Sequence, residues 1–333
     1  EFNQDKLEDN MWGYHRTVDQ KVNIGSAFFQ NEWKNEHWGF LIGGRLDKHN
    51  LIDHVIFSPR ANLRYNPTEN INLRFSYSSG FRAPQAFDED LHVENVGGNV
   101  AMVELADNLK EERSQSLSAS ADIYHRFGAF QVNFLVEGFY TKLSDVFALT
   151  DGEVVDGILT RTRYNAPGAR VMGLTLEGKM AYLTKFQVQA GVTLQQSHYS
   201  EPHVWNKEAP AVKKMMRTPN TYGYFTATYT PIKPLSIALS GTYTGSMLVP
   251  HEPVPGFLEK PITVNTKDFF DIGLKAAYDF KLYKSMNLQV NAGVQNIFNA
   301  YQNDFDKWAD RDSGYIYGPS LPRSFFAGVK ISY

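Results

Sequence analysis

The chain has 333 residues, a formal net charge of −3, no cysteine and 14% aromatic residues. This charge gives no basic bias toward nucleic acid, and the absence of cysteine excludes disulfides and thiolate metal sites. No apolar run approaches the roughly 18 residues of a membrane-spanning helix, which excludes helical membrane proteins and leaves membrane barrels open.

Apolar and polar residues alternate along most of the chain. In residues 71–78, INLRFSYS, the odd positions are apolar or aromatic and the even ones polar, and the same period of two occurs at 186–195, 235–243, 286–295 and 327–333. A period of two with one apolar face indicates strands that lie between two different media. The pattern predicts about thirteen strands and no helix longer than a turn or two.

The connections between these strands differ in length. Short polar connections are expected at 31–37, 66–70, 125–129, 183–185, 231–234 and 281–285. Between them lie 48–54, which is also short, and the longer connections 85–111, 150–162, 200–217, 248–267 and 301–322. Alternation of tight and long connections is typical of an up-and-down barrel that spans a membrane, and neither a soluble sandwich nor a propeller explains it. The predicted fold class is therefore all-β, a transmembrane antiparallel up-and-down β-barrel.

The two faces of the predicted strands carry different residues. Aromatic residues lie in or beside the short turns, as a membrane interface selects. On the opposite face to the apolar residues lie polar and charged side chains, which cannot form a dry core and are expected to line a wet lumen. The lumen-lining candidates are Arg60, Arg64, Arg74 and Gln289.

Seven phrases of the sequence resemble strand and strand-end phrases of one family. They are GGRLDKH (43–49), SPRANLRYNP (58–67), SGFRAP (79–84), YNAPGARVMGLTLEG (164–178), MRTPNTYGYFTATY (216–229), VQNIFNAY (294–301) and YGPSLPRSFFAGVKISY (317–333). Because the seven phrases occur in the order expected for the family, the chain resembles the C-terminal part of the barrel of TonB-dependent outer-membrane receptors. The ending, Gly328-x-x-Ile331-x-Tyr333, is similar to the signal by which barrel proteins are recognised for insertion.

The resemblance implies a domain organisation. Barrels of this family have about 22 strands around a plugged lumen, so residues 1–333 are expected to form the last thirteen strands. The strand that ends in Phe81-Arg82-Ala83-Pro84 then becomes the thirteenth strand of the barrel, and 85–111 its seventh outer loop. The plug domain and the first barrel strands are expected to be absent from this chain.

The resemblance also implies a function. Such receptors take up a scarce, bulky ligand, which here would be a ferric siderophore, haem or cobalamin, across the outer membrane of a Gram-negative bacterium. The expected partners are outer-membrane lipid, the protein's own N-terminal plug and the TonB energy-coupling complex, but no nucleic acid. No permanently bound cofactor is expected, and the transported ligand is expected to contain iron or cobalt.

The candidate ligand-binding residues lie in the long connections or at strand ends. They are Arg82, His92, Met102, His198, His203 and His251. Arg82 could hold an anionic group through paired hydrogen bonds, and imidazole and thioether side chains could ligate haem iron, cobalt or copper. Receptors for haem carry an axial histidine between FRAP and an NPNL-like box, and His92 lies in that interval, although Asp107 replaces the proline of the box.

An acidic run near the C-terminus invites comparison with calcium sites. It holds Asp304, Asp306, Asp310 and Asp312 followed by Gly314. Closely spaced carboxylates suit calcium, but the spacing differs from that of an EF-hand loop. An ordinary acidic loop is therefore expected, and no metal site.

Three other function classes can be compared with the sequence: an enzyme, a passive porin and a glycan-import barrel. The sequence has no GxSxG, HExxH or P-loop pattern, so an enzyme is not expected. A passive porin would share the alternation and the aromatic residues at the short turns. A glycan-import barrel that works with a surface lipoprotein is a further alternative.

Overall fold

The computed structural model describes residues 1–11, 16–84, 100–155, 158–283, 285–308, 311–319 and 321–333. The regular elements in these ranges are all β-strands. None of the described residues belongs to a helix long and apolar enough to cross a membrane.

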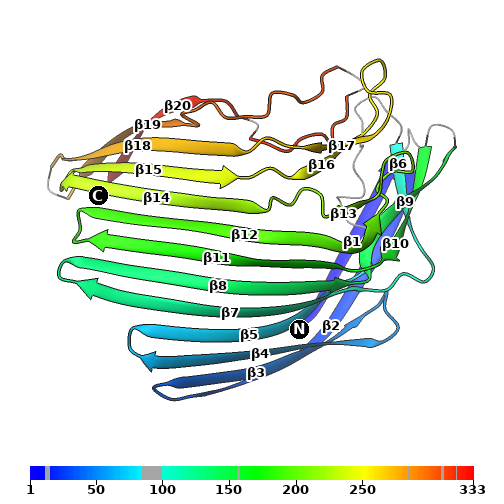
Figure 1. Cartoon of the computed structure of the whole chain (residues 1–333), viewed down its shortest axis with the longest axis horizontal. Coiled ribbons are helices and arrows are strands. Elements are labelled where there is room, and N and C mark those ends of the chain that lie inside the picture. Colours follow the sequence, from blue (N-terminus) through cyan, green and yellow to red (C-terminus); the bar gives the residue numbers. More distant parts are fainter. Residues whose placement is uncertain (12–15, 85–99, 156–157, 284, 309–310, 320) are drawn as a thin grey trace.

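One large antiparallel sheet dominates the structure and curves strongly (Figure 1). It contains 15 strands, of which β13 (Val212–Lys214) pairs only with β12 and the other fourteen follow one another in chain order. These are β1 (Phe2–Met11), β2 (Arg16–Lys34), β3 (Trp38–His49), β4 (Val55–Thr68), β5 (Ile71–Arg82), β7 (Glu112–Phe127), β8 (Phe130–Ser144), β11 (Ala169–Tyr182), β12 (Phe186–His203), β14 (Thr221–Ile232), β15 (Leu235–Thr244), β18 (Phe269–Lys281), β19 (Asn287–Gln295) and β20 (Ser324–Ser332). The all-β antiparallel prediction is confirmed.

Within the described residues, fourteen strands of this sheet follow one another, one more than the thirteen or so expected, and the short β13 lies beside them. The additional strand is β1, which pairs with β2 from Phe2↔Gly25 to Met11↔Arg16. Its sequence, FNQDKLEDNM, is rich in charge and has no apolar face, so a search for alternating apolar residues misses it. Its backbone pairing rather than its side chains makes it a strand.

The six short polar connections lie at one end of the sheet, and the long connections lie at the other, together with the short connection 48–54. The hairpin turns close at pairs such as Thr68↔Ile71, Phe127↔Phe130 and Ile232↔Leu235. Because successive strands are antiparallel, all six short turns meet at one end, on the left in Figure 1, and the long connections meet at the other. The predicted sorting of connections by end is confirmed.

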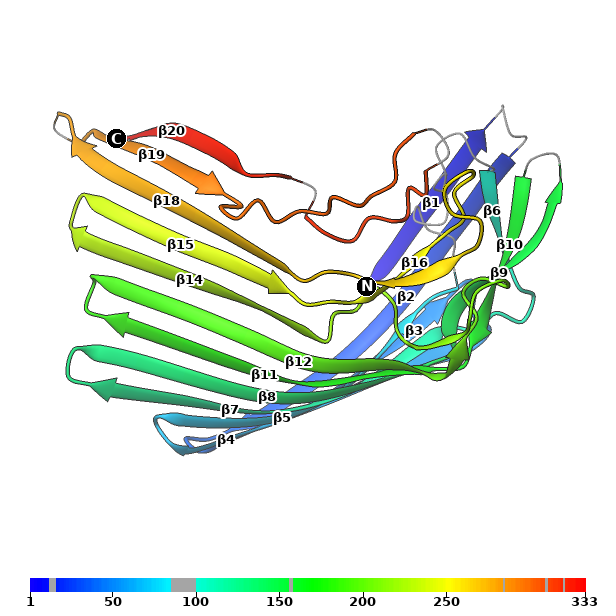
Figure 2. The same cartoon turned by 45° about the horizontal axis from the view of Figure 1, so that its top comes forward.

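The long connections have secondary structure of their own. Residues expected to be loops contain β6 (Val100–Leu105), β9 (Val146–Val155) and β10 (Ile158–Ala166), which form a sheet in the order β6-β10-β9. β6 is parallel to β10, so two successive long connections share one small sheet. A second hairpin pairs β16 (Leu248–His251) with β17 (Ile262–Asn265). Figure 2 shows these elements gathered at the end that carries the long connections.

The register of the large sheet separates a polar face from an apolar one. Arg64 lies opposite Arg74, and Arg74 lies opposite Ser120. The neighbouring positions pair Leu63 with Phe75, and large apolar side chains on that face stay exposed, Phe75 at 50%. The single sheet therefore has no core of its own along most of its length.

Two glycines of β3 make room for long side chains on the polar face. A Cβ on Gly39 would lie 3.3 Å from the Arg64 guanidinium, and one on Gly43 would lie 3.3 Å from Nε of Arg60. The arginine stems thus lie flat across the neighbouring strand, where a larger residue would displace them.

Burial concentrates at the end of the long connections. Ile52, Ile56 and Ala83 form one buried cluster with Phe81 packed against it. A second cluster contains Met247, Val249 and Tyr315, with Val264 and Tyr317 packed against it. The long connections therefore fold against one another, and the connections that supply each cluster also supply a group of polar side chains.

Candidate ligand-binding site

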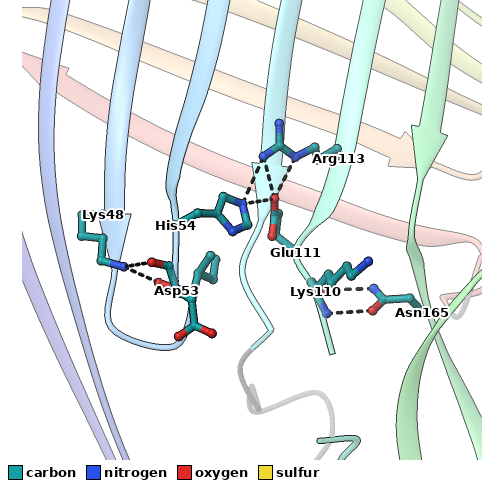
Figure 3. Close-up of polar contacts among 8 residues, drawn as sticks. Lys48, Asp53, His54, Lys110, Glu111, Arg113 and Asn165 are labelled. Carbon is teal, nitrogen blue, oxygen red and sulfur yellow. Dashed lines mark hydrogen bonds and ion pairs between the residues drawn. The ribbon is translucent and has the colours of Figure 1, made fainter. Parts of the chain in front are cut away.

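The first of these polar groups, here called the loop base, surrounds the two ends of the connection between β5 and β7. It consists of Arg82, Lys110, Glu111, Glu112 and Arg113 with their partners His54, Phe147, Arg163 and Asn165. Figure 3 shows part of it, with side chains from three different connections turned toward one another.

Arg82 ends β5 and lies against an aromatic ring from the next connection. Its guanidinium carbon is 5.3 Å from the centroid of Phe147 in β9, and that of Arg163 in β10 is 5.6 Å from the same centroid. Cation–π attraction favours both approaches. Glu112 accepts a hydrogen bond from the backbone N–H of Phe147 at 3.0 Å, which fixes the ring to the start of β7.

Asn165, at the end of β10, binds the backbone of Lys110 in both directions (Figure 3). The Lys110 N–H donates to Oδ1 at 2.7 Å, and Nδ2 donates to the Lys110 carbonyl at 3.0 Å. Nδ2 also donates to the carbonyl of Asp145 at 2.8 Å. One side-chain amide therefore joins two long connections.

Glu111 ties the same segment to the connection between β3 and β4. Its Oε1 lies 3.0 Å from Nε2 of His54, and it accepts hydrogen bonds from Nε of Arg113 at 2.8 Å and from the Arg113 NH2 at 2.7 Å (Figure 3). The carboxylate side chain is only 5% exposed. Burial raises the pKa of Glu111, but hydrogen bonds from its own backbone, Arg113 and His54 outweigh it, and the net pKa is lowered.

Lys48 holds the turn that carries His54. Its ammonium group donates to the carbonyls of Ile52 at 2.6 Å and Asp53 at 2.8 Å. Because Ile52 belongs to the buried cluster beneath, the turn is fixed from both sides. The loop base is thus a group of charged, hydrogen-bonded side chains at the ends of strands, which suits a ligand-binding site.

The second polar group lies between the β16–β17 hairpin and the last connection, residues 296–323, here called the last loop. Nε2 of His251 lies 2.9 Å from Oδ2 of Asp306, and both side chains are buried. The imidazole also stacks on the ring of Tyr315, with centroids 3.8 Å apart and planes 6° apart. The backbone N–H of Glu252 donates to Asp312 at 2.9 Å.

The structure separates the sequence-predicted binding residues. Arg82 belongs to the loop base, and His251 is buried against the last loop. His198 and His203 lie on β12, where His203 packs on Tyr199 with ring centroids 4.7 Å apart. Met102 lies in β6, whose backbone alone is described there, and His92 and Asp310 lie outside the described residues.

Among the described histidines, His203 contacts Tyr199 and His251 contacts Asp306 and Tyr315, so these two do not share a ligand set. Within the described ranges, no group of three or more His, Cys, Asp or Glu side chains is arranged to hold a metal ion. The lumen-lining candidates Arg60, Arg64 and Arg74 share the polar face of the sheet, and Gln289 donates to Asp279 of the neighbouring strand at 2.9 Å. Their place in a lumen stays a prediction.

Sequence reasoning missed the residues that assemble the loop base. Glu111, Phe147 and Asn165 have no unusual spacing that marks them. Asn165 lies within the family-like phrase YNAPGARVMGLTLEG, which was the available signal, but its partner Lys110 is 55 residues away. Only the pairing of two long connections brings them together.

Comparison with protein families shows to which family the chain belongs. The family model described as "TonB dependent receptor-like, beta-barrel" matches residues 4–297. The chain belongs to the TonB-dependent receptor β-barrel family. This family consists of receptors and transporters rather than enzymes. No curated protein sequence matches the chain.

Solved structures share the fold of this TonB-dependent receptor barrel chain. A mutant of the ferric enterobactin receptor PfeA from Pseudomonas aeruginosa superimposes with a TM-score of 0.67 at 18% identity, covering 98% of this chain and 49% of that one. The siderophore receptor PirA from Acinetobacter baumannii gives 0.69 at 16% identity, covering 98% and 50%. A variant of the FrpB iron transporter from Neisseria meningitidis gives 0.61 at 18%, covering 94% and 45%. The chain spans about half the length of each.

Proposed function

We propose that the chain is part of an outer-membrane receptor that takes up a ferric complex of the siderophore class, with energy delivered through TonB. The observation that carries the proposal is the loop base. It places Arg82 of β5 and Arg113 of β7 at the end of the sheet where the long connections meet, with the buried Arg163 of β10 beside the same Phe147 ring as Arg82. Ferric siderophores are bulky and commonly anionic, and guanidinium groups on rigid elements suit such ligands.

The two faces of the large sheet, here called the wall, support a membrane location. The apolar face keeps large side chains exposed, such as Phe134 at 47% and Val290 at 41%, and exposed apolar surface on this scale suits lipid rather than water. Aromatic pairs such as Trp38–Tyr65 and Phe130–Tyr182 lie beside the short turns, where an interface girdle is expected. The opposite polar face would line a lumen with Arg60, Arg64, Arg74 and Gln289.

The half-length match supports the proposed domain organisation. Each neighbouring receptor is about twice as long as this chain. Residues 1–333 would therefore be the C-terminal part of a barrel, and the plug and remaining strands would belong to the rest of the receptor. TonB would act on that plug.

Among ligand classes, the structure favours a siderophore over haem or cobalamin. The printed descriptions of the neighbours concern enterobactin, siderophores and iron. His251 is buried against Asp306 and Tyr315, so it is not free to act as an axial ligand of haem. His92, His198, His203 and Met102 remain candidates for such a ligand.

Uptake by cells tests this proposal. Cells that produce the receptor should accumulate radiolabelled ferric siderophore, and deletion of residues 88–106 should abolish this accumulation while the barrel still inserts. A His92→Ala variant should keep siderophore uptake. Haem uptake that is lost in this variant would reassign the ligand to haem. Glycan uptake that depends on a surface lipoprotein would instead favour the glycan-import alternative.

A further inference from the structure

Three oxygen donors come together on the exposed side of the last loop. The Tyr317 hydroxyl donates to Asp304 and lies 2.6 Å from both carboxylate oxygens. The Tyr315 hydroxyl donates to Oδ2 of the same carboxylate at 3.3 Å. Asp304 is exposed, whereas Tyr317 is half-buried and Tyr315 is buried, so the group, here called the oxygen triad, reaches solvent through Asp304.

The backbone that carries the triad is braced from several sides. Gln302 donates to the carbonyl of Tyr315 at 3.0 Å and accepts from the N–H of Tyr317 at 2.8 Å. Arg217 donates to the carbonyls of Gly314 and Ile316, the latter at 2.8 Å. The stacked His251 covers the buried face of Tyr315. The two hydroxyls are thus held in place by contacts that do not involve Asp304.

The chemistry of the triad selects a particular kind of cation. Two phenolates and one carboxylate carry three negative charges, which balance a trivalent ion. Phenolate and carboxylate oxygens are hard donors, and tyrosinate is an established protein ligand of ferric iron. A divalent cation that cannot displace the phenolic protons would find a single anionic donor here, so calcium is disfavoured.

We propose that Asp304, Tyr315 and Tyr317 form a binding site for ferric iron in the last loop. The inference deepens the proposed function and rests on it for the choice of iron among trivalent ions. Binding replaces the two phenolic O–H bonds with O–Fe bonds, and the two protons pass to solvent without any change of redox state. Three protein donors leave further positions on the iron for water or for oxygens of a chelator.

The protonation of the tyrosines restricts which ion can make this exchange. Burial, followed by the nearby Asp304, raises the pKa of both Tyr315 and Tyr317. Without a cation, both hydroxyls therefore keep their protons and donate to the carboxylate. A strongly polarising ion is needed to displace them, because the ligand form is the deprotonated one.

Iron binding to the purified protein in detergent micelles tests the site. Ferric nitrilotriacetate should produce a visible phenolate-to-iron absorption band, and iron should remain with the protein after desalting. Tyr317→Phe and Asp304→Asn should each weaken binding by more than about tenfold, since even groups one shell from a metal contribute about 10–100-fold. Tyr301→Phe is the matched control, because this exposed tyrosine of the same loop should leave the band unchanged.

The outcomes separate the site from the proposed function. Tyr317→Phe keeps the ring that packs against Tyr315 with centroids 5.3 Å apart, and Asp304→Asn keeps both rings, so neither removes the packing of the loop. A wild-type protein without the band, or either variant with an unchanged band, would overturn the site even if cells take up ferric siderophore. A band that is lost in both variants would support the site even if uptake fails.

Discussion

Asn165 and Lys110 pair as two strands do, although one partner is a side chain. The Asn165 amide accepts from the Lys110 N–H at 2.7 Å and donates to the Lys110 carbonyl at 3.0 Å. Because Asn165 ends β10 and Lys110 precedes β7, this pair joins the connections that leave two successive hairpins. These two long connections are therefore joined to each other rather than independent.

Asn165→Ala should loosen the loop base without unfolding the wall. The change removes hydrogen bonds to Lys110 and Asp145 that are each worth about 0.5–1.5 kcal/mol net. Amide hydrogen exchange at Lys110 should accelerate, and siderophore affinity should fall. Asn35→Ala is the control, because the Asn35 side chain also binds the backbone, accepting from the N–H groups of His37 and Trp38, but in a short turn at the other end. Unchanged exchange at Lys110 would show that Asn165 does not hold this segment.

Acid should weaken the attachment made by Glu111. The pKa of this carboxyl is lowered from its usual 4.5, so its contribution to stability is complete above about pH 4.5 and is lost as the pH falls through the folded-state value. Glu111→Gln should reduce the protection of amides 106–113 from hydrogen exchange at neutral pH. In this variant, the protection should no longer decline as the pH falls. Hydrogen exchange measured across this pH range checks both effects. A decline in acid that persists in Glu111→Gln would assign it to another group.

The two faces of β15 should respond differently to charge. Leu239 lies on the apolar face opposite Ala227 and Leu274, whereas Ser240 lies on the polar face. Leu239→Arg should cost roughly 2–4 kcal/mol if the position is near the midplane of the bilayer, and Ser240→Arg should cost much less. Unfolding free energies measured in lipid vesicles test the difference. Equal losses would refute the assignment of faces.

The buried pair His251–Asp306 should hold the β16–β17 hairpin to the last loop. Removal of one partner leaves the other buried without its hydrogen bond, which costs about 1–3 kcal/mol. Asp306→Asn should therefore increase amide exchange in residues 314–317. Asp279→Asn, whose carboxylate accepts from Gln289 on the wall, should leave those amides unchanged. Equal protection in Asp306→Asn and the wild type would mean that the pair does not fasten the loop.

The fold was predictable because alternation is a local property. The strands of the large sheet after β1, apart from the short β13, follow from apolar faces such as that of Leu235, Ile237 and Leu239, and the order of short and long connections follows from turn residues. β1 was missed because its pairing depends on backbone hydrogen bonds to β2 and not on an apolar face. A local sequence pattern predicts the strands with an apolar face, whereas β1 depends on backbone pairing that the pattern does not show.

The site was less predictable because its contacts join distant segments. Arg82 was identified from its place at a strand end, but its contact with Phe147 depends on the packing of the next connection. His251 was predicted as a ligand-binding residue, yet its imidazole contacts Asp306, 55 residues away. Neither partner is encoded by spacing along the chain. His92 and Met102 stay predictions.

Energy-dependent uptake tests the central claim most directly. Cells that produce the receptor are supplied with radiolabelled ferric siderophore, with and without a functional TonB complex, and the entry of small uncharged solutes is measured in parallel. The account predicts saturable accumulation of iron that requires TonB, and no increase in solute entry. Iron entry that is independent of TonB, together with free passage of small solutes, would contradict it and identify a passive porin.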